Sequence, residues 1–174
     1  MEMLRRLFVV PLADNSHGKS RLVNALLAQG LGQRSPGRKG RRLLRTPWGR
    51  NIDALVYVRS FQETEKSAYP GVTDALRHDD DAWYSRDLIV MPSHLEVEDV
   101  VQMVQAAHEN GFDAIGAAIL LDNIEHPQYA ECWQAQWDER WTIPNPRRDT
   151  GWEDQVDALG RDLWAWISRA TLGG

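Results

Sequence analysis

Cysteine is nearly absent from the sequence, and so is any long hydrophobic run. The single cysteine, Cys132, cannot form an internal disulfide and excludes a zinc site built on paired cysteines. No apolar run approaches the ~20 residues that a membrane-spanning helix needs, and no secretion-signal pattern is visible. We therefore expect a cytoplasmic protein with no membrane partner. The 174 residues, 43% hydrophobic and 26% charged, have the ordinary composition of one globular domain, residues 1–174.

Acidic residues are missing from a long stretch near the N-terminus. Residues 15–52 contain no Asp or Glu, although the whole chain has a net charge of −5. The positive charges in that stretch are Lys19, Arg21, Arg34, Arg38, Lys39, Arg41, Arg42, Arg45 and Arg50. A local field of this sign attracts polyphosphate or a nucleic-acid backbone. Residues 32–50 are thus predicted to form a basic, mobile insertion or a hairpin, and residues 34–50 are a candidate surface for a nucleic acid or a protein partner.

A Gly-Lys-Ser sequence stands between an apolar run and a helical pattern. Residues 7–12 read Leu-Phe-Val-Val-Pro-Leu, and residues 13–20 read Ala-Asp-Asn-Ser-His-Gly-Lys-Ser. Strand, tight loop and helix form the context in which successive backbone N–H groups wrap a phosphate. Lys19 supplies a mobile positive charge for the β- and γ-phosphates, and the Ser20 hydroxyl suits Mg²⁺.

These residues resemble the phosphate-binding loop of the P-loop NTPases. The resemblance is good over roughly the first thirty residues, with one departure, because Ala13 stands where the family has its first glycine. It implies an α/β fold, a three-layer parallel sheet flanked by helices, and a site for Mg²⁺ with ATP or GTP. The nucleotide-binding residues that it implies are Asp14, Asn15, Ser16, His17, Gly18, Lys19, Ser20 and Arg21, with Lys19 as the catalytic residue.

Hydrophobic periodicity predicts buried strands that alternate with helices, which indicates a parallel sheet covered on both faces. Strands are predicted over residues 6–12, 41–46, 52–60, 87–91 and 114–121, and the second and third of these form a hairpin. Helices are predicted over residues 19–29, 72–77, 93–111, 127–141 and 152–167. Ser93 and Glu96 have capping-box spacing at the start of the third helix.

An acid that holds Mg²⁺ through water follows a neighbouring strand in many P-loop proteins. Here the strand that ends at Met91 is followed by Pro-Ser-His. Asp122, at the end of the strand predicted over 114–121, has the right local pattern and is taken with Ser20 as a metal candidate. The other acids that could reach the metal are Asp14, Asp53 and Glu63. Asp14 could instead shape the loop through an Asx turn.

Two groups of P-loop NTPases are similar to this chain in outline. The order of elements resembles the class of dethiobiotin synthetase and the plasmid-partition ATPases, in which a late strand ends at an Asn that contacts the base. That residue would be Asn123, but Asp14 stands where the partition ATPases carry a loop lysine. The size resembles small-molecule and nucleotide kinases, which close an arginine-bearing lid over the phosphates. The lid candidates are Arg140, Arg147 and Arg148.

The leading hypothesis is a kinase-like phosphotransferase that acts on Mg-ATP, in which Lys19 and a closing arginine stabilise the transferred group. His94 is a candidate general base. One alternative is a nucleotide-dependent switch or assembly ATPase or GTPase, whose product is a conformational change, with Thr46 placed like a switch threonine. A homodimer is a candidate assembly of this chain. A second alternative is a non-catalytic module that binds nucleic acid or a protein through residues 34–50.

Overall fold

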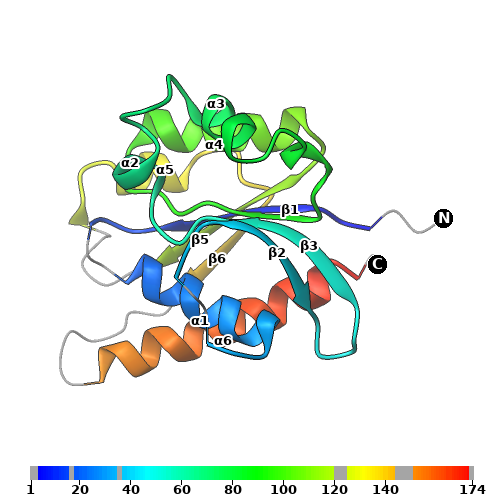
Figure 1. The fold of residues 1–174 in the computed structure, drawn as a ribbon. Helices are drawn as coiled ribbons and strands as arrows, with labels where there is room; N and C mark the ends of the chain where they lie inside the picture. The colour runs from blue at the N-terminus through cyan, green and yellow to red at the C-terminus, as the bar shows by residue number, and fades with distance from the viewer. Residues whose placement is uncertain (1–3, 16–17, 35–36, 120–124, 144–150, 173–174) are drawn as a thin grey trace.

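A computed structural model describes residues 4–15, 18–34, 37–119, 125–143 and 151–172 (Figure 1). The expectations for Ser16, His17, Asp122, Asn123, Arg147 and Arg148 lie outside these ranges. Among the helices in the described ranges, none is long and apolar enough to cross a membrane.

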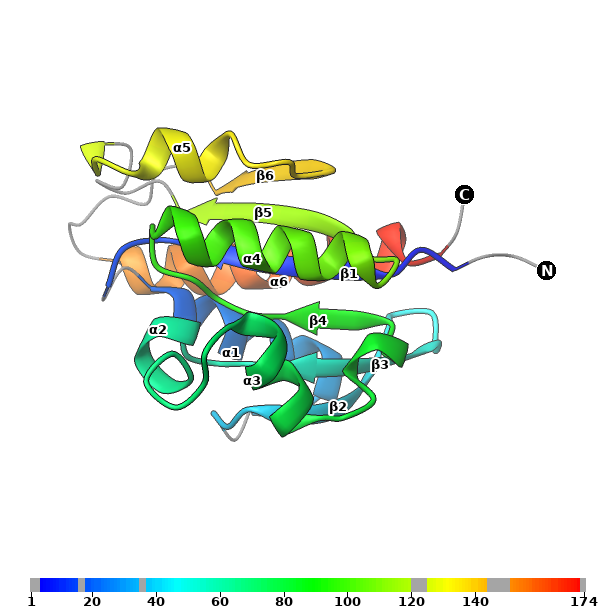
Figure 2. The same ribbon diagram turned by 90° about the horizontal axis from the view of Figure 1, so that it is seen from above.

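One six-stranded sheet forms the centre of the molecule, in the order β2-β3-β4-β1-β5-β6. Figure 2 shows this order from β6 at one edge to β2 at the other. The strands are β1 (Leu7–Leu12), β2 (Gly40–Arg45), β3 (Asn51–Val56), β4 (Leu88–Val90), β5 (Asp113–Ile119) and β6 (Glu139–Ile143). All neighbouring strands are parallel except the β2–β3 pair. The expected parallel sheet is therefore confirmed, and its central strand is β1, which is buried along its whole length.

Helices cover both faces of the sheet, as expected for three layers (Figure 1). One face carries α1 (Lys19–Leu31) and α6 (Trp152–Ala170). The opposite face carries α2 (Phe61–Thr64), α3 (Val72–Asp79), α4 (Val97–Glu109) and α5 (Tyr129–Trp133). Alternate residues of β1 serve the two layers, because successive strand side chains point to opposite faces. Leu7 and Val9 join the core beneath α1 and α6, whereas Phe8 and Val10 join the core beneath α4.

The β2–β3 hairpin is present as predicted, with Arg45 opposite Asn51. β3 ends at Val56 rather than at residue 60, because Ser60 is the N-cap of α2. Several charges of the basic segment are paired within the molecule. Lys39 Nζ lies 2.6 Å from Glu65 and 3.0 Å from Asp79. These contacts reduce the free positive field that the sequence predicted for residues 34–50.

The capping box predicted at Ser93 does not form. Ser93 continues the sheet instead, because its N–H donates to the Pro11 carbonyl at 2.9 Å and it forms a parallel bridge with Leu12. α4 begins later, at Val97, and the Val97 N–H is capped by Gln128 Oε1 at 3.1 Å. The partner across the sheet thus outweighs the local capping signal.

The helix predicted over 127–141 is also wrong, because only Tyr129–Trp133 is helical and residues 139–143 form β6. Trp137 lies between the two, where its indole N–H donates to the Cys132 carbonyl at 2.9 Å. Its ring occupies the space over Gly116, since a Cβ at that position would lie 2.9 Å from the ring. Backbone pairing with β5 decides the structure of the segment that follows.

Candidate functional site

The Gly-Lys-Ser loop lies at the carboxyl end of the central strand and leads directly into α1. Gly18 is the N-cap of α1 and has φ +93°, a left-handed conformation that other residues adopt only with strain. The first turn of a helix has N–H groups without intrahelical acceptors, and its dipole favours negative charge. The backbone at residues 18–21 therefore has the local structure of an anion-binding site.

Lys19 is buried, with 5% of its surface exposed. Its ammonium donates to the backbone carbonyls of Ala13 at 2.8 Å and Asp14 at 2.7 Å, so the side chain bridges the two ends of the loop. An ammonium has three donors, and the structure gives no third acceptor among the described residues. Burial lowers the pKa of Lys19 to about 8, an effect that the negative charges of Glu63 and Asp14 oppose.

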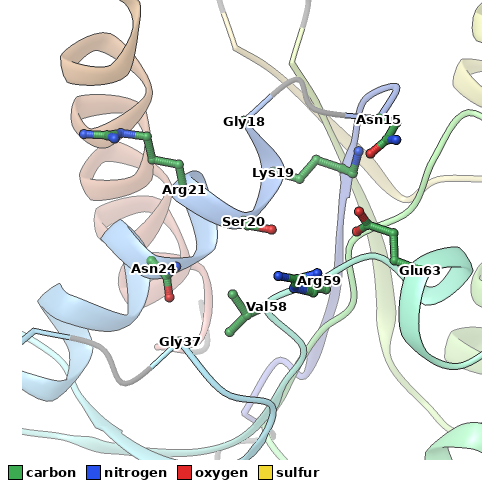
Figure 3. Close-up of a pocket in the computed structure, with 10 residues that line it drawn as sticks. All are labelled: Asn15, Gly18, Lys19, Ser20, Arg21, Asn24, Gly37, Val58, Arg59 and Glu63. Carbon is green, nitrogen blue, oxygen red and sulfur yellow. The ribbon is translucent and has the colours of Figure 1, made fainter.

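A pocket of about 430 Å³ opens beside the loop (Figure 3). It brings together three segments of the chain: the loop with the start of α1, the connection after α1, and the segment from the end of β3 into α2. Its lining residues are Asn15, Gly18, Lys19, Ser20, Arg21, Asn24, Gly37, Val58, Arg59 and Glu63. Asn15, Gly18, Lys19, Ser20 and Arg21 were predicted from the sequence, and the structure brings these five together.

Glu63 is the acid that the structure brings into this pocket. Its carboxylate accepts the Ser60 N–H at 3.1 Å and the Ser60 hydroxyl at 2.6 Å, both through Oε2, in a capping box for α2. Burial alone would raise its pKa, but the Ser60 hydrogen bonds and the nearby charges of His94 and Lys19 lower the pKa overall. Glu63 is thus an ionised carboxylate whose position is fixed, and Figure 3 shows it directed toward Lys19.

Four pocket residues were not predicted from the sequence, namely Asn24, Gly37, Val58 and Arg59, and Arg59 is the charged one among them. It is exposed and follows the carboxyl end of β3. No motif marks it, and only the sheet order places the end of β3 near the loop, two strands away from β1. A general signal did exist, because functional residues of parallel sheets gather at the carboxyl ends of strands.

Other predicted residues have different roles in the structure. Arg21 forms a bidentate pair with Asp157 on α6, with N···O distances of 2.9 and 2.8 Å, and Figure 3 shows it directed away from Lys19. Asp14 accepts the Asn15 N–H at 2.8 Å, which supports the loop-shaping role. Asp14 also lies 3.9 Å from His126, and the two line a different pocket from that of Figure 3.

Two of the candidates, Asp53 and Thr46, lie away from the pocket. Asp53 is at the amino half of β3, where it pairs with Arg41 at 2.9 Å and Arg86 at 3.1 Å, so it does not reach a metal at the loop. Thr46 lies at the same distant edge, in the hairpin turn, where its hydroxyl accepts the Arg50 N–H.

Arg140 pairs in register with Gly116, whose face of the sheet is covered by Trp133 and Trp137. Its guanidinium donates to the carbonyls of Trp133 at 2.8 Å and Ala135 at 3.0 Å. α1 covers the opposite face, so Arg140 is held away from the loop and does not line the pocket. Of the lid candidates, this leaves Arg147 and Arg148, which lie outside the described residues.

His94 follows β4, the strand beside β1, and is half-buried. Its Nε2 is fully buried and has no hydrogen-bond partner among the described residues. Burial lowers the pKa of His94, and the positive charge of Lys19 lowers it further, against the charges of Glu63, Glu96 and Asp14. A neutral imidazole therefore lies close to the loop.

No family model matches the chain, and no curated protein matches it in sequence. Among solved structures, one that is similar is described as "Crystal structure of APE1195". It is 13% identical, the match covers 96% of this chain and 99% of that chain, and the TM-score is 0.44.

Proposed function

We propose that the protein binds a magnesium–nucleoside triphosphate at the loop of residues 13–20 and transfers its γ-phosphoryl group, in the manner of a kinase. The observation that carries this proposal is the state of Lys19. A buried ammonium is costly unless it is hydrogen-bonded, and two loop carbonyls meet that need, while its third donor has no acceptor in the described part of the chain and would be met by a ligand. A phosphate oxygen at the mouth of the loop would accept that donor.

The backbone supports the same proposal. The N–H groups at the start of α1 and the positive end of its dipole favour a polyphosphate over an uncharged ligand. The pocket volume of about 430 Å³ lies in the range of small-molecule sites. Catalysis would follow from position and charge, because phosphoryl transfer needs little covalent participation by the protein.

The residues present also fit a magnesium ion that arrives with the nucleotide. Among the described residues no group of three or more His, Cys, Asp or Glu forms a metal cage. Mg²⁺ with a nucleotide needs only one or two protein oxygens, because phosphates and water supply the rest. Ser20 and Glu63 line the same pocket and would supply a hydroxyl and a carboxylate. The ion would neutralise charge on the β- and γ-phosphates.

Calorimetric titration with Mg-ATP and Mg-GTP tests this proposal. We expect saturable binding to the wild-type protein and at least ~100-fold weaker binding to Lys19→Ala, since the main cation of the site is lost. Arg77→Ala is the matched control, because Arg77 is exposed on α3 and its loss removes the same charge outside the pocket. The proposal fails if neither nucleotide binds at millimolar concentration, or if Lys19→Ala binds as the wild type does.

Product analysis separates a kinase from a switch ATPase that uses the same site. A switch releases NDP and phosphate and changes its conformation or assembly with the bound nucleotide. Sedimentation of the protein with and without a non-hydrolysable Mg-ATP analogue measures that second behaviour directly. Nucleotide-dependent dimerisation would favour the switch over the kinase.

A further inference from the structure

Arg59 extends from a short segment that is held at both ends. On one side the Tyr57 N–H donates to the Val90 carbonyl at 2.8 Å, and on the other the Phe61 N–H donates to the Pro92 carbonyl at 3.0 Å. Both bonds attach the segment to β4 and its extension. The backbone of Arg59 is therefore fixed relative to the sheet, and its exposed side chain lines the pocket.

The guanidinium of Arg59 differs from that of Arg21, the other arginine that lines the pocket, which pairs with Asp157 on α6. For Arg59 the structure gives no ion pair or hydrogen bond within the described ranges. The acidic residue that lines the pocket with it is Glu63, whose Oε2 accepts hydrogen bonds from the Ser60 N–H and hydroxyl. The pocket thus contains an exposed guanidinium whose charge is not neutralised by a paired acid.

The position of Arg59 also suits contact with a bound phosphate. Arg59 lines the same pocket as Lys19 and Ser20, and Figure 3 shows its side chain between Ser20, Val58 and Glu63. A phosphate held by the loop and by Lys19 would present its terminal oxygens to this space. A guanidinium presents its N–H groups as a planar fork that matches two phosphate oxygens, which a lysine cannot do.

We propose that Arg59 is the catalytic arginine of the site and stabilises the γ-phosphoryl group during its transfer; this inference rests on the proposed function. In that step the nucleophile oxygen forms a bond to the γ-phosphorus, and its proton passes to an oxygen of the transferred phosphoryl group. The bond between the γ-phosphorus and the bridging oxygen breaks, and its electron pair leaves with the nucleoside diphosphate. Arg59 stays protonated and offsets the charge on the equatorial oxygens. The arginine follows β3 in the same chain, so the reaction needs neither a lid arginine nor one from a partner.

Arg59→Ala and Arg59→Lys test the inference, with water as the phosphoryl acceptor and Arg77→Ala as the control. Hydrolysis of Mg-ATP is measured in single turnover. Calorimetry gives the affinity for a non-hydrolysable Mg-ATP analogue and for Mg-ADP with aluminium fluoride, a mimic of the transferred group. Arg59 is exposed, so circular dichroism and the melting temperature should confirm that the variants fold.

We expect Arg59→Ala to lower the hydrolysis rate and the aluminium fluoride affinity by at least ~100-fold, with less than about fivefold loss for the ATP analogue. Arg59→Lys should fall between, because it keeps the charge without the fork. Equal losses for both ligands, or no loss in either, would overturn the inference while leaving nucleotide binding at the loop intact. Failure of the wild type to bind either ligand would overturn the proposed function itself, and with it the role of Arg59.

Discussion

Gly160 of α6 lies directly against the backbone of Leu22 on α1. A Cβ built on Gly160 would be 2.6 Å from the Leu22 carbonyl oxygen and 2.7 Å from the Cβ of Ala25. Such distances leave no room for a methyl group. Since α1 begins at the Gly-Lys-Ser loop, this close approach fixes α6 against the helix that carries Lys19 and Ser20.

Gly160→Ala should therefore destabilise the protein, although alanine is the better helix former by about 1 kcal/mol. The added methyl group meets a backbone oxygen that cannot turn aside, and overpacking of this kind costs ~1–3 kcal/mol. The free energy of unfolding in urea measures the net effect. Gln155→Ala, an exposed position on the same helix, should stay within about 0.5 kcal/mol of the wild type. A more stable Gly160→Ala variant would show that α6 moves easily away from α1.

Nucleotide affinity should fall as the pH rises through about 8, the value to which burial lowers the pKa of Lys19. Phosphate binds the protonated ammonium, so above this pH the protein must take up a proton in order to bind. The affinity then decreases by up to about tenfold per pH unit. The nucleotide does not cause this dependence, since a terminal phosphate with a pKa near 6 is fully ionised there.

Calorimetry from pH 7 to 9, in two buffers of different ionisation enthalpy, gives both the affinity and the number of protons taken up. Lys19→Arg is the matched variant, because a guanidinium stays charged at every pH used. It should bind more weakly at pH 7 and show little dependence on pH. The same slope in wild type and variant would assign the effect to another group.

Glu63→Gln should reduce the contribution of Mg²⁺ to nucleotide binding by ~10-fold or more, as expected for a lost carboxylate at a metal site. The amide oxygen still accepts the Ser60 hydrogen bonds, so α2 keeps its cap. The ratio of affinities with Mg²⁺ and with EDTA measures this contribution. Ser60→Ala leaves the charge and removes part of the cap, so it should cost ~1 kcal/mol of stability with a smaller change in that ratio. An unchanged ratio in Glu63→Gln would exclude Glu63 from the metal site.

The central strand and the loop after it could be predicted from the sequence, because neighbouring residues determine them. β1 is buried on both faces and therefore appears as a continuous apolar run, and the loop residues that follow it are contiguous. β6 was missed because Tyr129, Trp133, Trp137 and Trp141 are spaced four apart and imitate a helix. The helix ends at Trp133, and the Trp137 ring packs over Gly116. That contact joins residues that are distant in the sequence, so no local pattern predicts it.

The candidate site could be predicted only in part, because some of its residues are distant from the loop in the sequence. Lys19 and Ser20 follow from one motif, but Arg59 reaches the site from the segment after β3 and Glu63 from α2. Their approach depends on β4 lying between β3 and β1, which no local pattern specifies. Asp53, on the same strand, looked equally suitable in sequence. It lies in the amino half of that strand, paired with Arg41.

His94 should make the protein less stable as the pH falls from about 7.5 to 5.5. In the folded state burial and Lys19 lower its pKa, whereas in the unfolded chain the pKa is near the ordinary value of about 6.5. The unfolded state therefore binds more protons in this range, and the free energy of unfolding decreases as the pH drops. The groups that act on the ring are Lys19 of α1, Glu63 of α2, Asp14 of the loop and Glu96.

Urea unfolding of the wild type, His94→Leu and His94→Gln at several pH values in this range measures the contribution. Both variants lack the titrating group, so the difference in unfolding free energy between wild type and variant should shrink or reverse toward pH 5.5. His94→Leu also removes the buried Nε2 that has no partner among the described residues, and at pH 7.5 it should be at least as stable as His94→Gln. A parallel decline of all three proteins with pH would show that other groups govern the acid sensitivity, and that His94 is solvated when the protein is folded.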